Sequence, residues 1–165
     1  MGKKKKIAKT NAIREVEKHK MTMELREYPW SEDHLEARHV AESLGEDVHA
    51  IFKTIVVTGN ETGPVVAVLP GDEELDLKAL AKVSHNKKVE LLHLKDLEKT
   101  TGYIRGGCSP IGMKKHFPTY IDNEAKTFDF ITVSAGRRGL QMKLSPDDIA
   151  TLTKATFADI TAKKG

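Results

Sequence analysis

The chain has 165 residues, 39% of them hydrophobic and 31% charged, a composition typical of one soluble globular domain and not of a disordered chain. The formal net charge is only +3, and lysines in the two terminal tails account for it, so charge alone does not indicate a nucleic-acid-binding face. Cys108 is the single cysteine, which excludes an intramolecular disulfide, and no apolar run is long enough for a membrane span or a secretory signal. We therefore expect a cytoplasmic protein without a membrane partner.

The first residues differ in composition from the rest of the chain. Residues 1–9 contain four successive lysines, which repel one another, and predict a flexible basic arm. Such an arm is either simply solvated or has an accessory contact with RNA. Residues 10–162 contain no linker and no internal repeat, so they are predicted to form one domain.

The N-terminal third predicts two helices and two strands. A helix is expected at 10–19, where Thr or Asn can cap its start, and a half-buried strand at 23–28, where apolar and polar residues alternate. A second helix is predicted at 31–45. Residues 51–57 are β-branched or aromatic on both faces and predict a central, buried strand.

A lysine interrupts this buried strand. Alternation places Lys53 on the same face as Ile51 and Ile55. An ammonium group among apolar neighbours is costly unless it is paired or opens onto a cleft. The residues alone leave both interpretations open: a snorkelling or salt-bridged lysine, or a lysine that works in a cleft.

The rest of the chain predicts further strands and short helices. The expected elements are a strand at 64–69 forming an antiparallel hairpin with 51–57, a helix at 77–84, a strand at 89–92, a helix at 94–100, strands at 118–122, 127–133 and 140–144, and a helix from 145 to about 156. Helices interrupt the strands irregularly, which disfavours a regularly wound parallel sheet. The predicted fold class is α+β with a mixed, mostly antiparallel sheet.

A glycine-rich segment at 102–115 cannot form a stable helix interior or central strand, because glycine raises the entropic cost of ordering. Gly106 and Gly107 would let backbone N–H groups approach an anionic or carbonyl oxygen, and Lys114 adds positive charge. Composition alone leaves open whether this loop binds a ligand or is an ordinary connection.

Side chains with nucleophilic or metal-binding chemistry form no recognisable motif. None of the seven histidines belongs to a His-Glu-x-x-His pattern or accompanies a Cys-x-x-Cys pair, so neither a metal nor a cofactor is expected. Cys108 would need a lowered pKa and an adjacent base to act as a nucleophile, and we interpret it as a packing residue. A Gly-x-Ser-x-Gly elbow is absent, because Ile111 stands where the second glycine belongs.

Three stretches together resemble a known enzyme family. They are GGCSPIGMKK at 106–115, AESLG at 41–45 followed by FKTIV at 52–56, and VSAGRRGL at 133–140. They occur in the order found in the YbaK/EbsC family of free-standing aminoacyl-tRNA deacylases. The resemblance implies a curled, barrel-like sheet flanked by helices, and a trans-editing hydrolase that deacylates misacylated tRNA, above all Cys-tRNA(Pro).

The resemblance also implies roles for single residues. Lys53 would stabilise negative charge on the ester carbonyl or bind the terminal ribose and phosphate, and Thr54 beside it would add a hydroxyl donor. Backbone N–H groups around Gly106 and Gly107, with Ser109, would contact the substrate. The other residues expected to bind substrate are Tyr28, Pro110, Gly112, Lys114, Ser134, Gly136, Arg137 and Asp148.

Two of these residues keep an ordinary structural interpretation beside the functional one. Tyr28 also suits a core position with its hydroxyl satisfied. Asp148 also suits the N-terminus of the last helix, where a carboxylate is favourable.

Two other functions stay open on the sequence alone. A domain of this fold could capture an aminoacyl-tRNA end or another phosphate ligand without hydrolysing it, and a deacylase could prefer Ala-tRNA(Pro), because relatives with that preference differ in the pocket and not in the loop. The expected partner is the acceptor end of tRNA. Prolyl-tRNA synthetase is a further expected partner that could supply tRNA specificity.

Overall fold

In the computed structural model, residues 8–30 and 37–162 are described, so residues 1–7 of the predicted arm and 31–36 of the predicted second helix lie outside this part of the chain. No helix within these two ranges is long and apolar enough to cross a membrane. The helices are α1 (Asn11–Lys18), α2 (Ala37–Leu44), η1 (Val48–Ala50), α3 (Leu77–Val83), α4 (Leu94–Thr101), η2 (Asn123–Thr127) and α5 (Pro146–Thr153). The strands are β1 (Glu24–Glu27), β2 (Phe52–Gly59), β3 (Gly63–Pro70), β4 (Val89–Leu91), β5 (Thr119–Asp122), β6 (Ile131–Arg137), β7 (Leu140–Leu144) and β8 (Thr156–Ala158).

Local chemistry sets several helix ends as the sequence predicts. Thr10 caps α1, its hydroxyl oxygen accepting a hydrogen bond from the Ile13 N–H at 3.2 Å. Asp76 caps α3 in the same way, accepting from the Ala79 N–H at 3.0 Å. Helix α4 ends at Gly102, whose φ of +88° is the left-handed conformation that glycine adopts at little cost.

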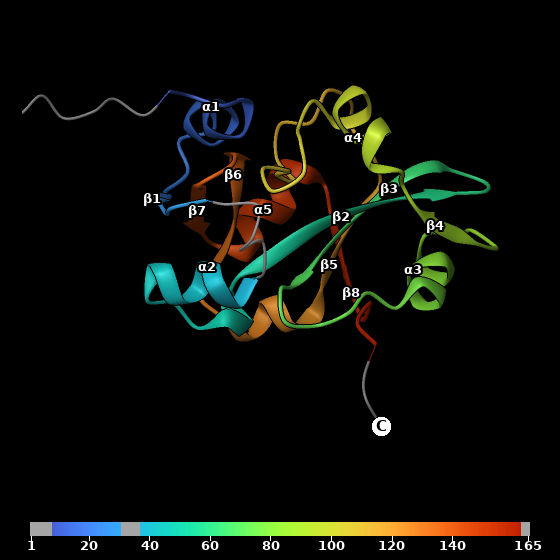
Figure 1. Ribbon diagram of the computed structural model, residues 1–165. Coiled ribbons are helices and arrows are strands. Elements are labelled where there is room, and N and C mark those ends of the chain that lie inside the picture. Colours follow the sequence, from blue (N-terminus) through green and yellow to red (C-terminus); the bar gives the residue numbers. More distant parts are fainter. Residues whose placement is uncertain (1–7, 31–36, 163–165) are drawn as a thin grey trace, which may run out of the picture.

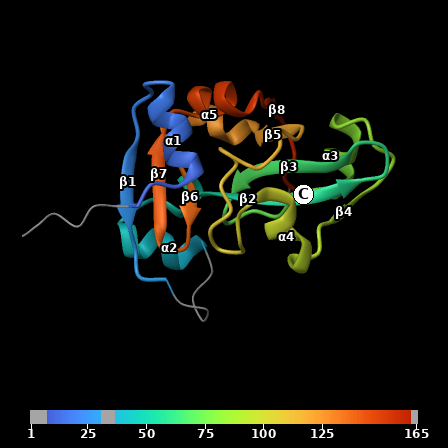
Figure 2. The same cartoon turned by 90° about the horizontal axis from the view of Figure 1, so that it is seen from above.

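The described strands form two open sheets, which lie on opposite sides of the molecule in Figures 1 and 2. The three-stranded sheet has the order β1-β7-β6 and is antiparallel throughout. The five-stranded sheet has the order β4-β2-β3-β5-β8, in which β5 pairs parallel with both of its neighbours. One isolated parallel bridge, between Ile51 and Thr132, joins β6 to the start of β2.

The mixed α+β class and the antiparallel hairpin of β2 with β3 are confirmed. The expected single curled, barrel-like sheet is not observed. After the one bridge at Ile51, β2 leaves β6 and pairs with β3 and β4, so the strands divide between two sheets and neither closes.

The main hydrophobic core is shared by both sheets, α1 and α5. It includes Ile13, Val16, Phe52, Val56, Val66, Val68, Val133, Met142 and Ile149. The opposite face of β2 and β3 packs on α3 through Val57, Ala67, Leu80 and Ala81. A smaller cluster packs Tyr28 and Ile51 against α2. Strand β2 is therefore buried on both faces, as predicted.

The strand expected at 127–133 begins later and ends later. Residues up to Thr127 form η2, whose start is capped by Asp122 accepting from the Glu124 N–H at 3.0 Å, and β6 runs from Ile131 to Arg137. The 3-10 turn thus takes the first residue of the predicted strand, and pairing with β7 begins only at Ile131.

The last helix also departs from the prediction. It ends at Thr153, because Lys154 adopts a left-handed conformation with φ +55°. The next residues, Thr156–Ala158, form β8 and pair parallel with β5. A β-branched residue followed by an aromatic one suits a strand better than a fourth helical turn.

Candidate active site

The amine of Lys53 is held at the start of β2. Its Nζ donates a hydrogen bond to the Gly71 carbonyl oxygen at 3.3 Å, and the Gly71 N–H donates to the Ile51 carbonyl oxygen at 2.7 Å. Burial lowers the pKa of Lys53 below its ordinary value, while the acidic side chains at 72–74 act in the opposite direction. Within the described residues the amine has no ion-pair partner, so the salt-bridged interpretation is not supported.

Ser134 lies on the same side of the molecule as Lys53. Side chains alternate along a strand, so Lys53 on β2 and Ser134 on β6 both point away from the main core, which holds Phe52 and Val133. The bridge between Ile51 and Thr132 brings the two strands together two residues before these positions. The structure thus assembles two of the predicted site residues on one face.

Tyr28 and Gln141 extend this face. Gln141 pairs with Ser134 across β6 and β7, and its Nε2 donates a hydrogen bond to the Tyr28 hydroxyl oxygen at 3.4 Å. Both side chains are buried. The Gln141 Oε1 atom is buried and has no hydrogen-bond partner among the described residues. Gln141 is a candidate site residue that the sequence analysis missed, because a glutamine in an alternating strand carries no motif.

The Gly106-Gly107 turn packs against the turn between β6 and β7. A Cβ atom at Gly106 would lie 2.9 Å from Trp30 Nε1, and one at Gly107 would lie 2.9 Å from the Arg138 nitrogen. The Arg138 side chain fastens the loop: its Nε donates to the Arg105 carbonyl oxygen at 2.9 Å, and its guanidinium lies 4.2 Å from the centre of the Trp30 ring. Only glycine allows so close an approach.

The two glycine N–H groups are not equivalent. The Gly107 N–H donates to the Ile104 carbonyl oxygen at 2.9 Å, so it is not free for a substrate. The Gly106 N–H has no acceptor among the described residues. Of the two predicted donors, Gly106 is the one that the loop leaves available.

Thr54 and Asp148 do not join Lys53. Thr54 is adjacent to Lys53 in the chain, so it points to the opposite face of β2, where its hydroxyl is buried without a partner among the described residues. This orientation argues against a second donor beside the lysine. Asp148 lies in the first turn of α5, where its charge suits the helix N-terminus.

Ser109 and Gly136 support the loop from within. Ser109 is fully buried, and its hydroxyl oxygen accepts a hydrogen bond from the Ile111 N–H at 3.2 Å. Gly136 has φ +99°, and a Cβ atom there would lie 2.8 Å from the Tyr103 ring. The Tyr103 hydroxyl in turn donates to the Ile111 carbonyl oxygen at 2.7 Å. Half-buried Arg137 precedes the Arg138 contact on the same turn.

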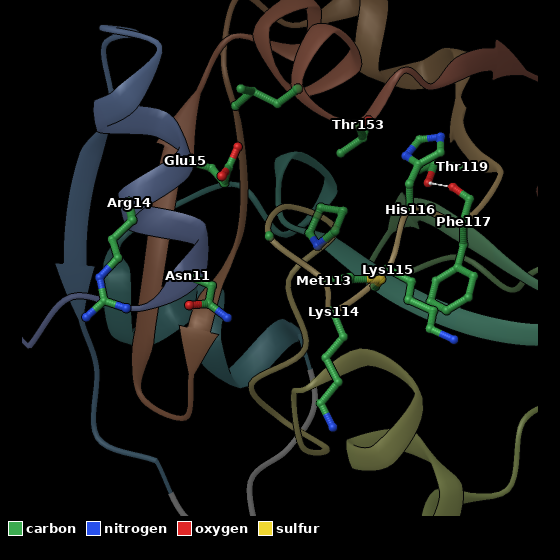
Figure 3. A pocket seen from close by; sticks show the side chains of 13 residues that line it. Asn11, Arg14, Glu15, Met113, Lys114, Lys115, His116, Phe117, Thr119 and Thr153 are labelled. Atoms are coloured by element: carbon green, nitrogen blue, oxygen red, sulfur yellow. Dashed lines mark hydrogen bonds between the residues drawn. The ribbon is translucent and has the colours of Figure 1, made fainter.

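Pro110, Gly112 and Lys114 line a separate cavity of about 480 Å³ between α1 and the glycine-rich loop (Figure 3). Its other lining residues are Asn11, Arg14, Glu15, Met113, Lys115, His116, Phe117, Thr119, Leu152 and Thr153. Figure 3 shows Arg14 on one side of this cavity and the two lysines on the other. The lining carries more positive than negative side chains, which suits an anionic ligand.

Two further groups have reactive or metal-binding chemistry. Burial raises the pKa of the Cys108 thiol to about 12, which opposes a nucleophilic role. A group of three side chains that no sequence motif connects could hold a metal ion. Ligand atoms of His49, Glu73 and Glu124 all lie within 4.8 Å of one another.

The names of known proteins similar to this chain refer to tRNA and its aminoacylation. A family model described as an aminoacyl-tRNA editing domain matches residues 32–152. A protein of Enterococcus faecalis, provisionally named Cys-tRNA(Pro)/Cys-tRNA(Cys) deacylase EbsC, is 63% identical over 164 residues, which are 99% of this chain and 100% of that protein. Proline–tRNA ligase 1 of Streptomyces avermitilis is 36% identical over 77 residues, which are 46% of this chain and 13% of that enzyme.

Solved structures share the fold at lower sequence identity. A crystal structure provisionally described as a trans-editing enzyme for prolyl-tRNA synthetase has a TM-score of 0.80 at 21% identity, covering 95% of this chain and 100% of that one. Another crystal structure, of a protein described only as hypothetical, has a TM-score of 0.84 at 22% identity, covering 93% of this chain and 100% of that one. At these identities the likeness concerns the fold alone.

Proposed function

The chain belongs to the family of aminoacyl-tRNA editing domains, and we infer that it is a trans-editing hydrolase that deacylates misacylated tRNA, releasing the free amino acid and the tRNA. The observation that carries this inference is the 63% identity with EbsC of Enterococcus faecalis, which extends over both chains. The name of that relative supports Cys-tRNA(Pro) as the preferred substrate. Because this substrate is used in translation, we place the protein in the cytoplasm and assign residues 10–162 to a single editing domain.

The proposed reaction needs no protein nucleophile. A water molecule attacks the ester carbonyl carbon, the bond from that carbon to the ribose oxygen breaks, and the ribose oxygen leaves with a proton from the water. Where the thiol of a cysteinyl substrate attacks instead, the carbonyl carbon bonds to sulfur as the ribose oxygen leaves with the thiol proton, and water then hydrolyses the resulting cyclic thioester to free cysteine. Negative charge develops on the carbonyl oxygen during the attack. We assign the stabilisation of this charge to Lys53, because its amine is half-buried and not neutralised by an ion pair among the described residues.

We assign recognition of the aminoacyl group to the face that carries Ser134, Tyr28 and Gln141. The buried Gln141 Oε1 has no partner among the described residues and would accept a hydrogen bond from the substrate's α-amino group. The Trp30 Nε1 atom, also buried and without a partner there, lies beside Gly106 and would donate to an oxygen of the substrate. A bound substrate would supply a hydrogen-bond partner to both atoms.

We assign the tRNA acceptor end to the positively charged surface around the glycine-rich loop. Arg14, Lys114 and Lys115 line one cavity there, and Arg137 lies on the neighbouring turn. Each could contact a phosphate group. Prolyl-tRNA synthetase is proposed as the partner that supplies tRNA identity, in keeping with the 77-residue similarity to a proline–tRNA ligase.

The test is a panel of radiolabelled aminoacyl-tRNAs incubated with the purified protein, with loss of acid-precipitable label as the readout. We expect rapid release from Cys-tRNA(Pro) and slow release from correctly charged Pro-tRNA(Pro). Faster release from Ala-tRNA(Pro) than from Cys-tRNA(Pro) would show that the enzyme prefers the alanyl ester. Retention or protection of every ester would refute hydrolysis and identify a binding module.

A further inference from the structure

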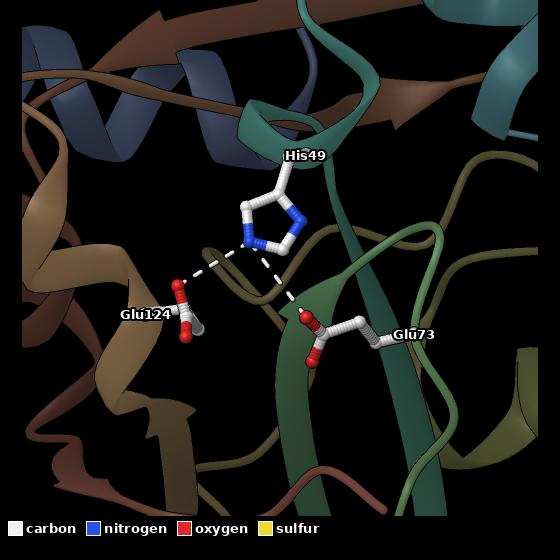
Figure 4. A group of neighbouring side chains, drawn as sticks. All are labelled: His49, Glu73 and Glu124. Atoms are coloured by element: carbon white, nitrogen blue, oxygen red, sulfur yellow. Dashed lines mark hydrogen bonds and ion pairs between the residues drawn. The ribbon is translucent and has the colours of Figure 1, made fainter. Parts of the chain in front are cut away.

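Three side chains from distant parts of the chain converge beside the loop that holds Lys53. His49 belongs to η1, Glu73 follows β3 and Glu124 lies in η2. Figure 4 shows the imidazole facing both carboxylates. The His49 Nε2 atom lies 3.3 Å from Glu124 Oε2 and 3.7 Å from Glu73 Oε1.

These separations match those of a metal coordination shell. In a tetrahedral zinc site each nitrogen or oxygen ligand lies about 2.0–2.2 Å from the ion, so neighbouring ligand atoms are about 3.3–3.6 Å apart. The distances from His49 Nε2 to the two carboxylates are therefore already close to those that a shared ion requires. The three side chains are between 28% and 39% exposed, so an ion and its water ligands can reach them.

A fourth side chain holds the imidazole in the orientation that metal binding needs. The Asp72 Oδ1 atom lies 3.1 Å from His49 Nδ1, on the opposite side of the ring from Nε2. When a metal ion replaces the proton that Nε2 shares with Glu124, the carboxylate at Nδ1 would keep the other proton on that nitrogen and orient the Nε2 lone pair toward the ion. Carboxylate–histidine–metal arrangements use the same outer contact.

The charge balance of the cluster also favours a cation. The carboxylates of Asp72, Glu73 and Glu124 surround one imidazole. Even with His49 protonated and the Lys53 ammonium acting on Asp72 and Glu73 from nearby, the negative charges outnumber the positive ones. A divalent ion would supply two positive charges at the same place.

We propose that His49, Glu73 and Glu124 bind a divalent transition-metal cation of the Zn²⁺ class, with Asp72 orienting the histidine. An imidazole with two carboxylates suits Zn²⁺ or Mn²⁺ better than Ca²⁺, which prefers oxygen ligands alone. The ion would join the loop after β3 to η2, and that loop also supplies the Gly71 carbonyl that holds Lys53. This site departs from the expectation of no metal, which considered only motifs within short stretches.

The experiment measures Zn²⁺ and Mn²⁺ binding to the untagged, chelator-treated chain by isothermal titration calorimetry, with thermal melting in parallel. We expect one equivalent of Zn²⁺ per chain and a higher melting temperature with the metal. His49→Ala, Glu73→Gln and Glu124→Gln should each weaken binding at least tenfold, and Asp72→Asn should weaken it by about 10- to 100-fold. The matched controls, His19→Ala and Glu74→Gln, should bind like the wild type.

The outcomes separate a built site from chance binding to surface side chains. No binding by the wild type, or equal binding by wild type and His49→Ala, would overturn the proposal. If His49→Ala does not fold, the near-isosteric Glu124→Gln decides, because it keeps the side-chain shape and loses one ligand charge. The readout is metal affinity, so its result is independent of whether the chain hydrolyses aminoacyl-tRNA.

Discussion

The Lys53 amine donates a hydrogen bond to the Gly71 carbonyl oxygen at 3.3 Å, which fixes the amine at the start of β2 without neutralising its charge. Lys53→Met removes the charge and keeps most of the apolar stem. We expect single-turnover deacylation of Cys-tRNA(Pro) to fall at least a hundredfold, a loss of about the size found when one charge-stabilising donor is removed. Lys82→Met, at an exposed position of α3, is the control and should keep full activity. Full activity of Lys53→Met would remove this lysine from the mechanism.

The same substitution should change stability in a pH-dependent way. Burial lowers the pKa of Lys53 below its ordinary 10.5, so the protonated amine is less favourable in the folded chain than in the unfolded one. Below the lowered pKa both states carry the proton and this cost is fully present, whereas it disappears as the pH rises through that pKa toward 10.5. In urea unfolding, the gain in the free energy of unfolding of Lys53→Met over the wild type should therefore be largest near pH 7 and smallest near about pH 10. A loss of stability at neutral pH would mean that the Gly71 contact outweighs burial.

Gly107 should not tolerate a side chain. An added Cβ atom would lie 2.9 Å from the Arg138 nitrogen and 3.0 Å from the Arg137 carbonyl carbon, and backbone atoms cannot move aside singly. We expect Gly107→Ala to cost about 1–3 kcal/mol in urea unfolding and to reduce deacylation, because the loop must leave the β6–β7 turn.

Gly45→Ala is the matched control for this substitution. Gly45 has a positive φ, of +67°, which Gly107 does not have, but a Cβ atom at Gly45 would have no neighbour within 4 Å. It should cost about 1–2 kcal/mol of backbone strain and leave the deacylation rate unchanged. Equal losses of activity in both variants would show that general destabilisation, and not the loop, is responsible.

Much of the fold follows from local chemistry that a sequence displays. The Thr10 cap, the stop at Gly102 and the hairpin of β2 with β3 each depend on residues close together in the chain. Strand β8 and the division into two sheets depend on pairings between distant segments, which alternation of apolar residues does not specify.

The candidate site shows the same limit. Lys53 could be singled out because a charge within an apolar strand is unusual, and Gly106 because glycines in a loop permit close approach. Gln141 could not, because its importance lies in a contact with Tyr28, 113 residues away. The approach of His49 to Glu124 also has no sequence signal, because 75 residues separate them.

The single cysteine should be inert in the folded protein. Burial raises the pKa of the Cys108 thiol to about 12, so its thiolate population at pH 8 is roughly a thousandfold smaller than that of a free thiol. Iodoacetamide should therefore modify folded Cys108 far more slowly than the urea-unfolded chain, and the rate should rise with pH. Cys108→Ala should deacylate Cys-tRNA(Pro) at the wild-type rate. Loss of turnover in that variant, with an unchanged melting temperature, would assign the thiol to the chemistry.

The lysines of the glycine-rich loop should account for part of the salt dependence of tRNA binding. Lys114 and Lys115 are exposed and line the cavity that Arg14 closes from the other side. Each phosphate contact that a substitution removes lowers the slope of log affinity against log salt by about 0.7–0.9. We expect Lys114→Gln with Lys115→Gln to reduce this slope by about 1–2, to raise the KM and to leave the kcat unchanged.

The control pair for the salt experiment is Lys87→Gln with Lys88→Gln, which removes the same charge next to β4. Because these lysines do not line the cavity, the slope should stay at the wild-type value. Equal reductions of the slope in the two double variants would show that net charge alone steers the tRNA. An unchanged slope in the Lys114→Gln, Lys115→Gln variant would show that the acceptor end binds elsewhere. A fall in kcat would instead connect these lysines to the chemical step, since contacts that only position the tRNA act on substrate and transition state alike.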